Sequence, residues 1–273
     1  MKTPPPNEDW VAPALPVRVE RDRRFLVFAG LVLVALSLGL KSELVAPSGA
    51  WWLATGLLAV GVPSIVAYLW SETGPRVPPL EHYIPALLGA IGIAGLSLVV
   101  RQWWSWALVA VIFGAGVAVA ARLDYLRLAA HPKRGHHFIQ EGILVLALVG
   151  GYVAILSSPF SSLLKLGWVC VLSGLAAYRS FRTTAEPLPA RRAFLFSLLV
   201  AQVATFFAWA IFAYAGSAPE GVFAAMLLLA WYINRGVIRH TAEETLNRHV
   251  AMEYGLFVAL LAFLFALSYR PPG

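Results

Sequence analysis

Residues 193–239 read AFLFSLLVAQVATFFAWAIFAYAGSAPEGVFAAMLLLAWYINRGVIR. As one straight helix this apolar stretch would be about 70 Å long, more than twice the roughly 30 Å of hydrocarbon in a bilayer. Gly216, Ser217, Ala218 and Pro219 interrupt the stretch near its middle, and proline does not continue a helix comfortably. The stretch therefore predicts two antiparallel membrane-spanning helices joined by a turn.

The same length rule, applied to the whole chain, predicts about nine membrane-spanning helices. It divides the apolar stretch 83–121 at Arg101 and Gln102, and the stretch 138–178 at Ser157, Ser158 and Pro159. The expected spans are approximately 25–44, 50–70, 83–100, 103–121, 138–156, 162–178, 193–215, 221–239 and 250–269. The fold class is therefore an all-α polytopic membrane protein, whose helices form antiparallel hairpins. The bundle, 25–269, lies between a Pro/Arg-rich tail, 1–24, and a short outer tail, 270–273.

Composition supports the membrane as the solvent of this chain. Only 13% of the 273 residues are charged and 59% are hydrophobic, whereas about 25% of the residues in a soluble domain are charged. So few ionised groups cannot cover a water-soluble fold of this size. The one cysteine, Cys170, lies in an apolar stretch, so a disulfide within the chain, a thiolate metal site and a CxxC redox pair are excluded.

Lysine and arginine are distributed unequally between the loops that join the expected spans. Seventeen of the 21 fall on the side of the amino terminus, and only Lys41, Arg101, Lys165 and Arg270 fall on the other side. Because short cytoplasmic loops collect positive charge, the amino terminus is expected in the cytoplasm and the carboxyl terminus outside the cytoplasmic (inner) membrane.

The net charge of +7 suggests an acidic partner. The basic residues lie in short runs between apolar stretches, so anionic lipid headgroups on the cytoplasmic side are the expected partner and nucleic acid is not. The candidate headgroup contacts are the loop residues Arg122, Arg127, Lys133, Arg134, Arg191 and Arg192.

Two histidine–glutamate pairs form the candidate polar site, together with Gln202 inside the seventh expected span. His137 and Glu141, like His249 and Glu253, are four residues apart, so each pair shares one helix face. A carboxylate inside the membrane is costly unless it is paired or faces water, so we expect both glutamates to point into the bundle. Such pairs could bind a cation, relay protons or act on a lipid headgroup. They are also the residues that stabilise a helix start, and we favour that structural role.

Metal and cofactor sites are not expected. His131, His136 and His137 lie in one loop and could in principle hold zinc, but Lys133 and Arg134 beside them would repel a metal ion.

Glu243, Glu244 and Arg248 read as EExxxR. This pattern resembles the first motif of the glutamate-type CAAX-processing intramembrane proteases, in which paired acids activate water and histidine motifs on later helices complete the site. The resemblance covers six residues. Only His249 follows among the histidines, and no FxxxH motif occurs after Arg248.

Alternate spans begin alike. A cationic or imidazole residue precedes the apolar run at Arg24, His82, His137, Arg192 and His249, every 55 to 58 residues. Duplication of a two-helix unit would produce this spacing, but so would any bundle with short loops in a bilayer of fixed thickness, and we favour the second explanation.

Three functions are left by the sequence. The first is a non-enzymatic accessory or scaffold protein of the inner membrane, which would bind a membrane-protein partner or form a homo-oligomer. The second is a carrier for an uncharged or lipidic solute, and the third is a membrane-embedded enzyme acting on lipid headgroups at the cytoplasmic face. The scaffold function ranks first because candidate sites are scarce.

Overall fold

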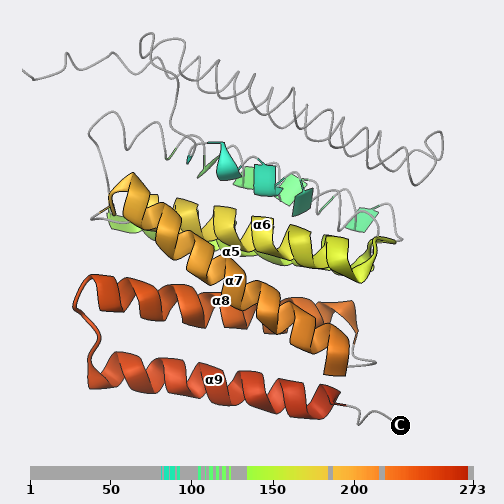
Figure 1. The fold of residues 1–273 in the computed structure, drawn as a ribbon. Coiled ribbons are helices and arrows are strands. Elements are labelled where there is room, and N and C mark those ends of the chain that lie inside the picture. Colours follow the sequence, from blue (N-terminus) through green and yellow to red (C-terminus); the bar gives the residue numbers. More distant parts are fainter. Residues whose placement is uncertain are drawn as a thin grey trace, which may run out of the picture.

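The computed structural model describes residues 134–183, 187–214 and 219–269, and single positions or short stretches between 81 and 123. The described part is helical and contains no strand. Its complete helices are α5 (Arg134–Ser157), α6 (Ser162–Arg182), α7 (Ala190–Tyr214), α8 (Glu220–Ala242) and α9 (Arg248–Ser268) (Figure 1). Each begins and ends within four residues of one of the last five expected spans, which confirms those helices.

Four of these helices are long and apolar enough to cross a membrane: α5 over Phe138–Ser157, and α7, α8 and α9 over their whole length. The described part is therefore that of a membrane protein. The expected spans 25–44 and 50–70 and the tails 1–24 and 270–273 lie outside the described residues, and 83–100 and 103–121 are described only at some positions. Nine crossings and their orientation stay predictions.

The helices α5, α6, α7 and α8 pack as a closed ring around one core. Helix α5 contacts α6 and α8, and α7 contacts the same two helices from the other side, whereas α9 packs mainly on α8 and forms an edge of the described bundle (Figure 1). The largest fully buried side chains of the core are Tyr152, Phe181 and Trp231. They come from α5, α6 and α8, so each of these three helices contributes one large aromatic side chain to the core.

Small residues allow α7 to approach α6 closely. The buried face of α7 includes Ala193, Ser197, Ala201, Ala204 and Ala208. A Cβ placed on Gly174 of α6 would lie 3.3 Å from the Cβ of Ala201, which is tighter than an ordinary van der Waals contact. Small residues at such positions are the usual means by which membrane helices pack closely, since lipid provides no hydrophobic force between them.

A tight turn joins α8 to α9. The backbone N–H of Thr245 donates to the carbonyl of His240 at 2.9 Å, and Glu244 adopts a left-handed φ of 54°. This is the Schellman arrangement that commonly ends helices. Asn247 then caps α9, because its Oδ1 accepts a hydrogen bond from the N–H of Val250 at 3.0 Å.

Helix α9 is docked on α8 through aromatic residues, including Phe257, whose ring centroid lies 5.4 Å from that of Tyr232, and Tyr254. Tyr254 is buried, its ring centroid lies 6.2 Å from that of Tyr232 and 6.0 Å from that of His240, and its phenol lies against the backbone of Gly236. Only Tyr254 and Ser268 are buried along the whole of α9. The contact between Tyr254 and Gly236 therefore limits how closely the first turns of α9 approach α8.

We predict that Gly236→Ala destabilises the packing of α9. The new Cβ would overlap the phenol of Tyr254, and overpacking of this kind costs about 1–3 kcal/mol. The measurement is thermal unfolding in detergent, together with protease cleavage in the turn 243–247. Gly255→Ala is the matched control, because a Cβ on Gly255 meets nothing within 4 Å. Equal unfolding temperatures and cleavage rates for both variants would contradict the packing described.

Candidate functional site

The described arginines gather at one end of the bundle. Because successive helices are antiparallel, the starts of α5, α7 and α9 and the ends of α6 and α8 lie at the same end, which we call the basic end (Figure 1). It holds Arg134, Arg179, Arg182, Arg191, Arg192, Arg235, Arg239 and Arg248. Among the described residues, Lys165 is the only lysine or arginine at the opposite end, and its Nζ donates to the carbonyl of Leu156 at 2.8 Å.

A buried ion pair joins three helices at the basic end. Arg235 Nη2 of α8 lies 2.7 Å from Glu141 Oε1 of α5, and the same carboxylate oxygen accepts a hydrogen bond from Ser180 Oγ of α6 at 2.8 Å. The side chains of Arg235 and Glu141 are 8% and 16% exposed. With so little water nearby, each charge depends on the other, and removing one partner leaves an uncompensated charge in the core.

Polar contacts continue from this pair toward the middle of the bundle. The guanidinium carbon of Arg235 lies 5.6 Å from the ring centroid of Trp231, within the range of a cation–π interaction. Trp231 Nε1 donates to the carbonyl of Ser173 at 3.1 Å, and the hydroxyls of Ser173 and Tyr152 are 2.8 Å apart. The buried aromatic side chains of α5 and α8 are therefore hydrogen-bonded to α6.

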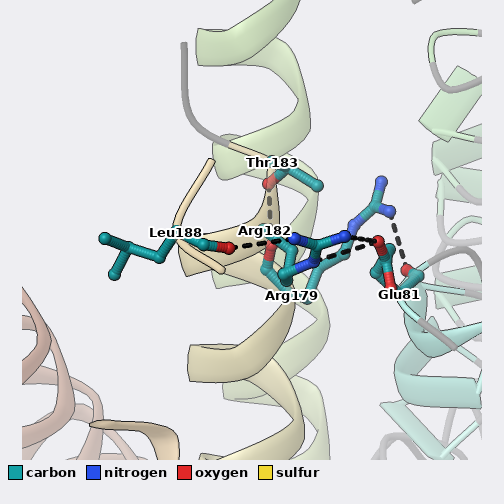
Figure 2. A network of polar contacts seen from close by, with 5 residues as sticks. All are labelled: Glu81, Arg179, Arg182, Thr183 and Leu188. Atoms are coloured by element: carbon teal, nitrogen blue, oxygen red, sulfur yellow. Dashed lines mark hydrogen bonds and ion pairs between the residues drawn. The ribbon is translucent and has the colours of Figure 1, made fainter. Parts of the chain in front are cut away.

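A second cluster ties the end of α6 to its neighbours, as Figure 2 shows. Arg182 donates to Glu81 Oε1 from Nε at 3.1 Å and from Nη2 at 2.8 Å, and from Nη1 to the carbonyl of Leu188 at 2.9 Å. Arg179 donates from Nη1 to the backbone carbonyl of Glu81 at 2.7 Å, and the hydroxyl of Thr183 donates to the carbonyl of Arg179 at 2.9 Å. One guanidinium thus holds residue 81 and the segment before α7 on the same helix end.

The structure places the residues of the expected polar site on different surfaces. Glu141 points into the bundle, as expected from its depth. Glu253 is exposed, so the expectation that it points inward is wrong: α9 turns Tyr254 toward α8, and the neighbouring position then faces away. His249 and Gln202 are exposed as well. The structure therefore does not bring Glu141 together with Gln202, His249 and Glu253.

The remaining candidate residues are placed in part. Arg191 and Arg192 are exposed at the start of α7 and accessible to headgroups. Arg134 and His137 belong to the first turn of α5, but their side chains are outside the described part, so the pairing of His137 with Glu141 is not described. Arg122, Arg127, Lys133 and His131 lie outside the described residues. Headgroup binding by these residues stays a prediction. In the described residues, no group of three histidines, cysteines or acids lies together.

The residues of the EExxxR segment form a local ion pair and the turn between α8 and α9. Glu243 Oε1 pairs with Arg239 Nε at 2.9 Å, one turn earlier on α8. Glu244 and Arg248 are separated by the turn, and the helical spacing that would pair them is absent. Of the two acids that carry the resemblance to the CAAX-processing proteases, Glu243 is therefore ion-paired with α8 and Glu244 lies in the turn.

Sequence reasoning missed Arg235, Ser180 and the arginines of α6 as parts of a cluster. From the sequence, Arg235 is counted only among the basic residues of the cytoplasmic side. In the structure it lies seven residues before the end of α8. That depth is the signal that could have identified it, because an ionised side chain about 10 Å inside a helix end requires a partner. Glu141 lies at the same depth from the start of α5.

Comparisons of the chain with protein-family models, with curated proteins and with solved structures find no match. The function of the chain is therefore inferred from its own geometry.

We predict that Glu141→Leu destabilises the protein by about 3–5 kcal/mol, because Arg235 is left charged and buried without a counter-ion. Thermal or denaturant unfolding in a mild detergent measures the change. Glu253→Leu is the control: its carboxylate is exposed, so its removal is expected to change stability by less than about 0.5 kcal/mol. If both substitutions destabilised the protein to the same extent, the inward position of Glu141 would be wrong.

Proposed function

We propose that this chain is a multi-pass protein of the cytoplasmic membrane that acts as a non-enzymatic accessory or scaffold protein. The observation that supports this most is the pairing of its inward-pointing carboxylates. Glu141 is bound to Arg235 and Ser180, and Glu81 is bound to Arg182, each across different segments of the described bundle. A carboxylate that acts on a substrate or carries an ion has to face the ligand. These carboxylates instead stabilise the packing of the helices against one another.

The proposal includes the topology predicted from the sequence: nine spans, with the amino terminus in the cytoplasm and the carboxyl terminus outside. Its support in the described part is the basic end, with eight arginines against one lysine at the opposite end. Such an asymmetry marks the cytoplasmic side. The exposed Arg191 and Arg192 would then contact anionic headgroups, as would Arg122, Arg127, Lys133 and Arg134 in the preceding loop.

Helix α9 is the surface that fits a partner in this proposal. Its small residues Ala251, Gly255, Ala259, Ala262 and Ala266 repeat, 58 positions later, the spacing of the small residues on the buried face of α7. All five are exposed, whereas their α7 counterparts are buried. Since the same pattern already supports close helix packing within this chain, a transmembrane helix of another membrane protein is the proposed occupant.

The double variant Glu141→Leu/Arg235→Met distinguishes a structural role of the ion pair from a role in binding or converting a ligand. Replacing a buried ion pair by apolar residues of similar volume is often neutral or stabilising. The free energy of unfolding of the double variant is therefore expected to lie within about 1 kcal/mol of that of the native protein. If the pair only braces the helices, the double variant also restores the phenotype of cells that lack the chain. The single variants Glu141→Leu and Arg235→Met serve as controls and are both expected to be unstable.

A folded double variant that fails to restore the phenotype would contradict the scaffold function. In that case the carboxylate of Glu141 acts on a ligand. The proposed function would then be a carrier for an uncharged or lipidic solute, or a headgroup enzyme.

A further inference from the structure

The outward face of α7 carries a regular row of exposed residues. Leu195, Leu199, Gln202, Phe206 and Trp209 recur at intervals of four, three, four and three, and therefore form one stripe along the helix. The four apolar members are 46–68% exposed, and Gln202 is exposed as well. By the 3.6-residue period this stripe lies nearly opposite the small residues that pack on α6.

Gln202 is the central residue of this stripe and of α7 itself. It has twelve helical residues on either side in Ala190–Tyr214, so in a membrane-spanning α7 it lies at the middle of the hydrocarbon. Its amide makes no hydrogen bond within the described part of the chain, unlike Thr205, whose hydroxyl donates to the carbonyl of Ala201 at 2.7 Å. An unbonded amide in hydrocarbon is strongly unfavourable, so this position requires a polar partner from outside the described part of the chain.

We propose that the partner is a second copy of this chain, packed α7 against α7 about a two-fold axis normal to the membrane, with the two Gln202 amides hydrogen-bonded to each other. Both copies have the same orientation in the membrane, so their α7 helices run parallel and residue 202 of each meets its equivalent at the same depth. An amide carries both donors and an acceptor, which makes this residue self-complementary.

The spacing of the stripe fits this arrangement. Apolar residues at alternating intervals of three and four are the pattern of parallel helix pairs with left-handed crossing, and a single polar residue within such a seam fixes its register. Arg191 and Arg192 precede the stripe at headgroup level, where long cationic side chains diverge toward lipid phosphates. The inference rests on α7 crossing the bilayer, as in the proposed function, and not on the scaffold role.

Cross-linking in vesicles tests the geometry. In a Cys170→Ala background, Phe206→Cys is expected to give a covalent dimer with a membrane-permeant oxidant. Val203→Cys is the matched control, since it is exposed at nearly the same depth but lies about 100° around the helix from Gln202. Equal dimer yields at 203 and 206, or none at 206, would overturn the proposal.

Dimer dissociation on dilution into lipid tests the role of Gln202. Gln202→Leu is expected to weaken the dimer about 3- to 30-fold, the range that interhelical hydrogen bonds in membranes support. Gln202→Asn keeps a self-complementary amide and is expected to retain affinity within about 3-fold. A native chain that stays monomeric, or a dimer unaffected by Gln202→Leu, would overturn the proposal. The scaffold function is tested separately. It is retained if a monomeric Gln202→Leu chain has an unchanged unfolding temperature and still restores the cellular phenotype.

Discussion

Hydrocarbon provides neither counter-ions nor hydrogen-bond partners, and the described bundle is arranged around that constraint. Its arginines are gathered at one end, and those that point inward are bound to carboxylates or backbone carbonyls of other segments. Farther inside, the polar atoms of Tyr152, Ser173 and Trp231 bind one another. Because each of these contacts joins different helices, together they favour this relative arrangement of α5, α6 and α8.

The pair of Glu141 and Arg235 has the largest consequence for this arrangement. Its two residues are 94 positions apart in the chain, and with Ser180 they join α5, α6 and α8 at a single carboxylate oxygen. Helix α7 is held differently, by small residues that allow it to approach α6, and α9 is held by aromatic contacts and by Tyr254 against Gly236. The ion pair thus joins α5, α6 and α8 at the basic end, while α7 and α9 are held by the fit of their side chains against neighbouring helices.

The length of the apolar stretches was sufficient to predict α5 to α9, because the thickness of hydrocarbon sets the length of a span whatever its neighbours. The direction in which a residue faces was predicted only in part. Glu141 and Glu253 both lie near a helix start, yet one is paired in the core and the other is exposed, because α9 contacts the bundle on the side of Tyr254 alone. Likewise, the small residues of α7 and α9 have the same spacing, but only those of α7 are covered. Which face is covered depends on contacts between distant segments, and helical periodicity within one segment does not contain that information.

Alternating crossings that keep the basic end in the cytoplasm are the premise on which the depth of Glu141, Arg235 and Gln202 depends. Compartment-sensitive reporters inserted near Ala185, between α6 and α7, and after Gly273 test it most directly. We expect a cytoplasmic signal near Ala185 and an external signal after Gly273. The same compartment for both reporters would contradict it.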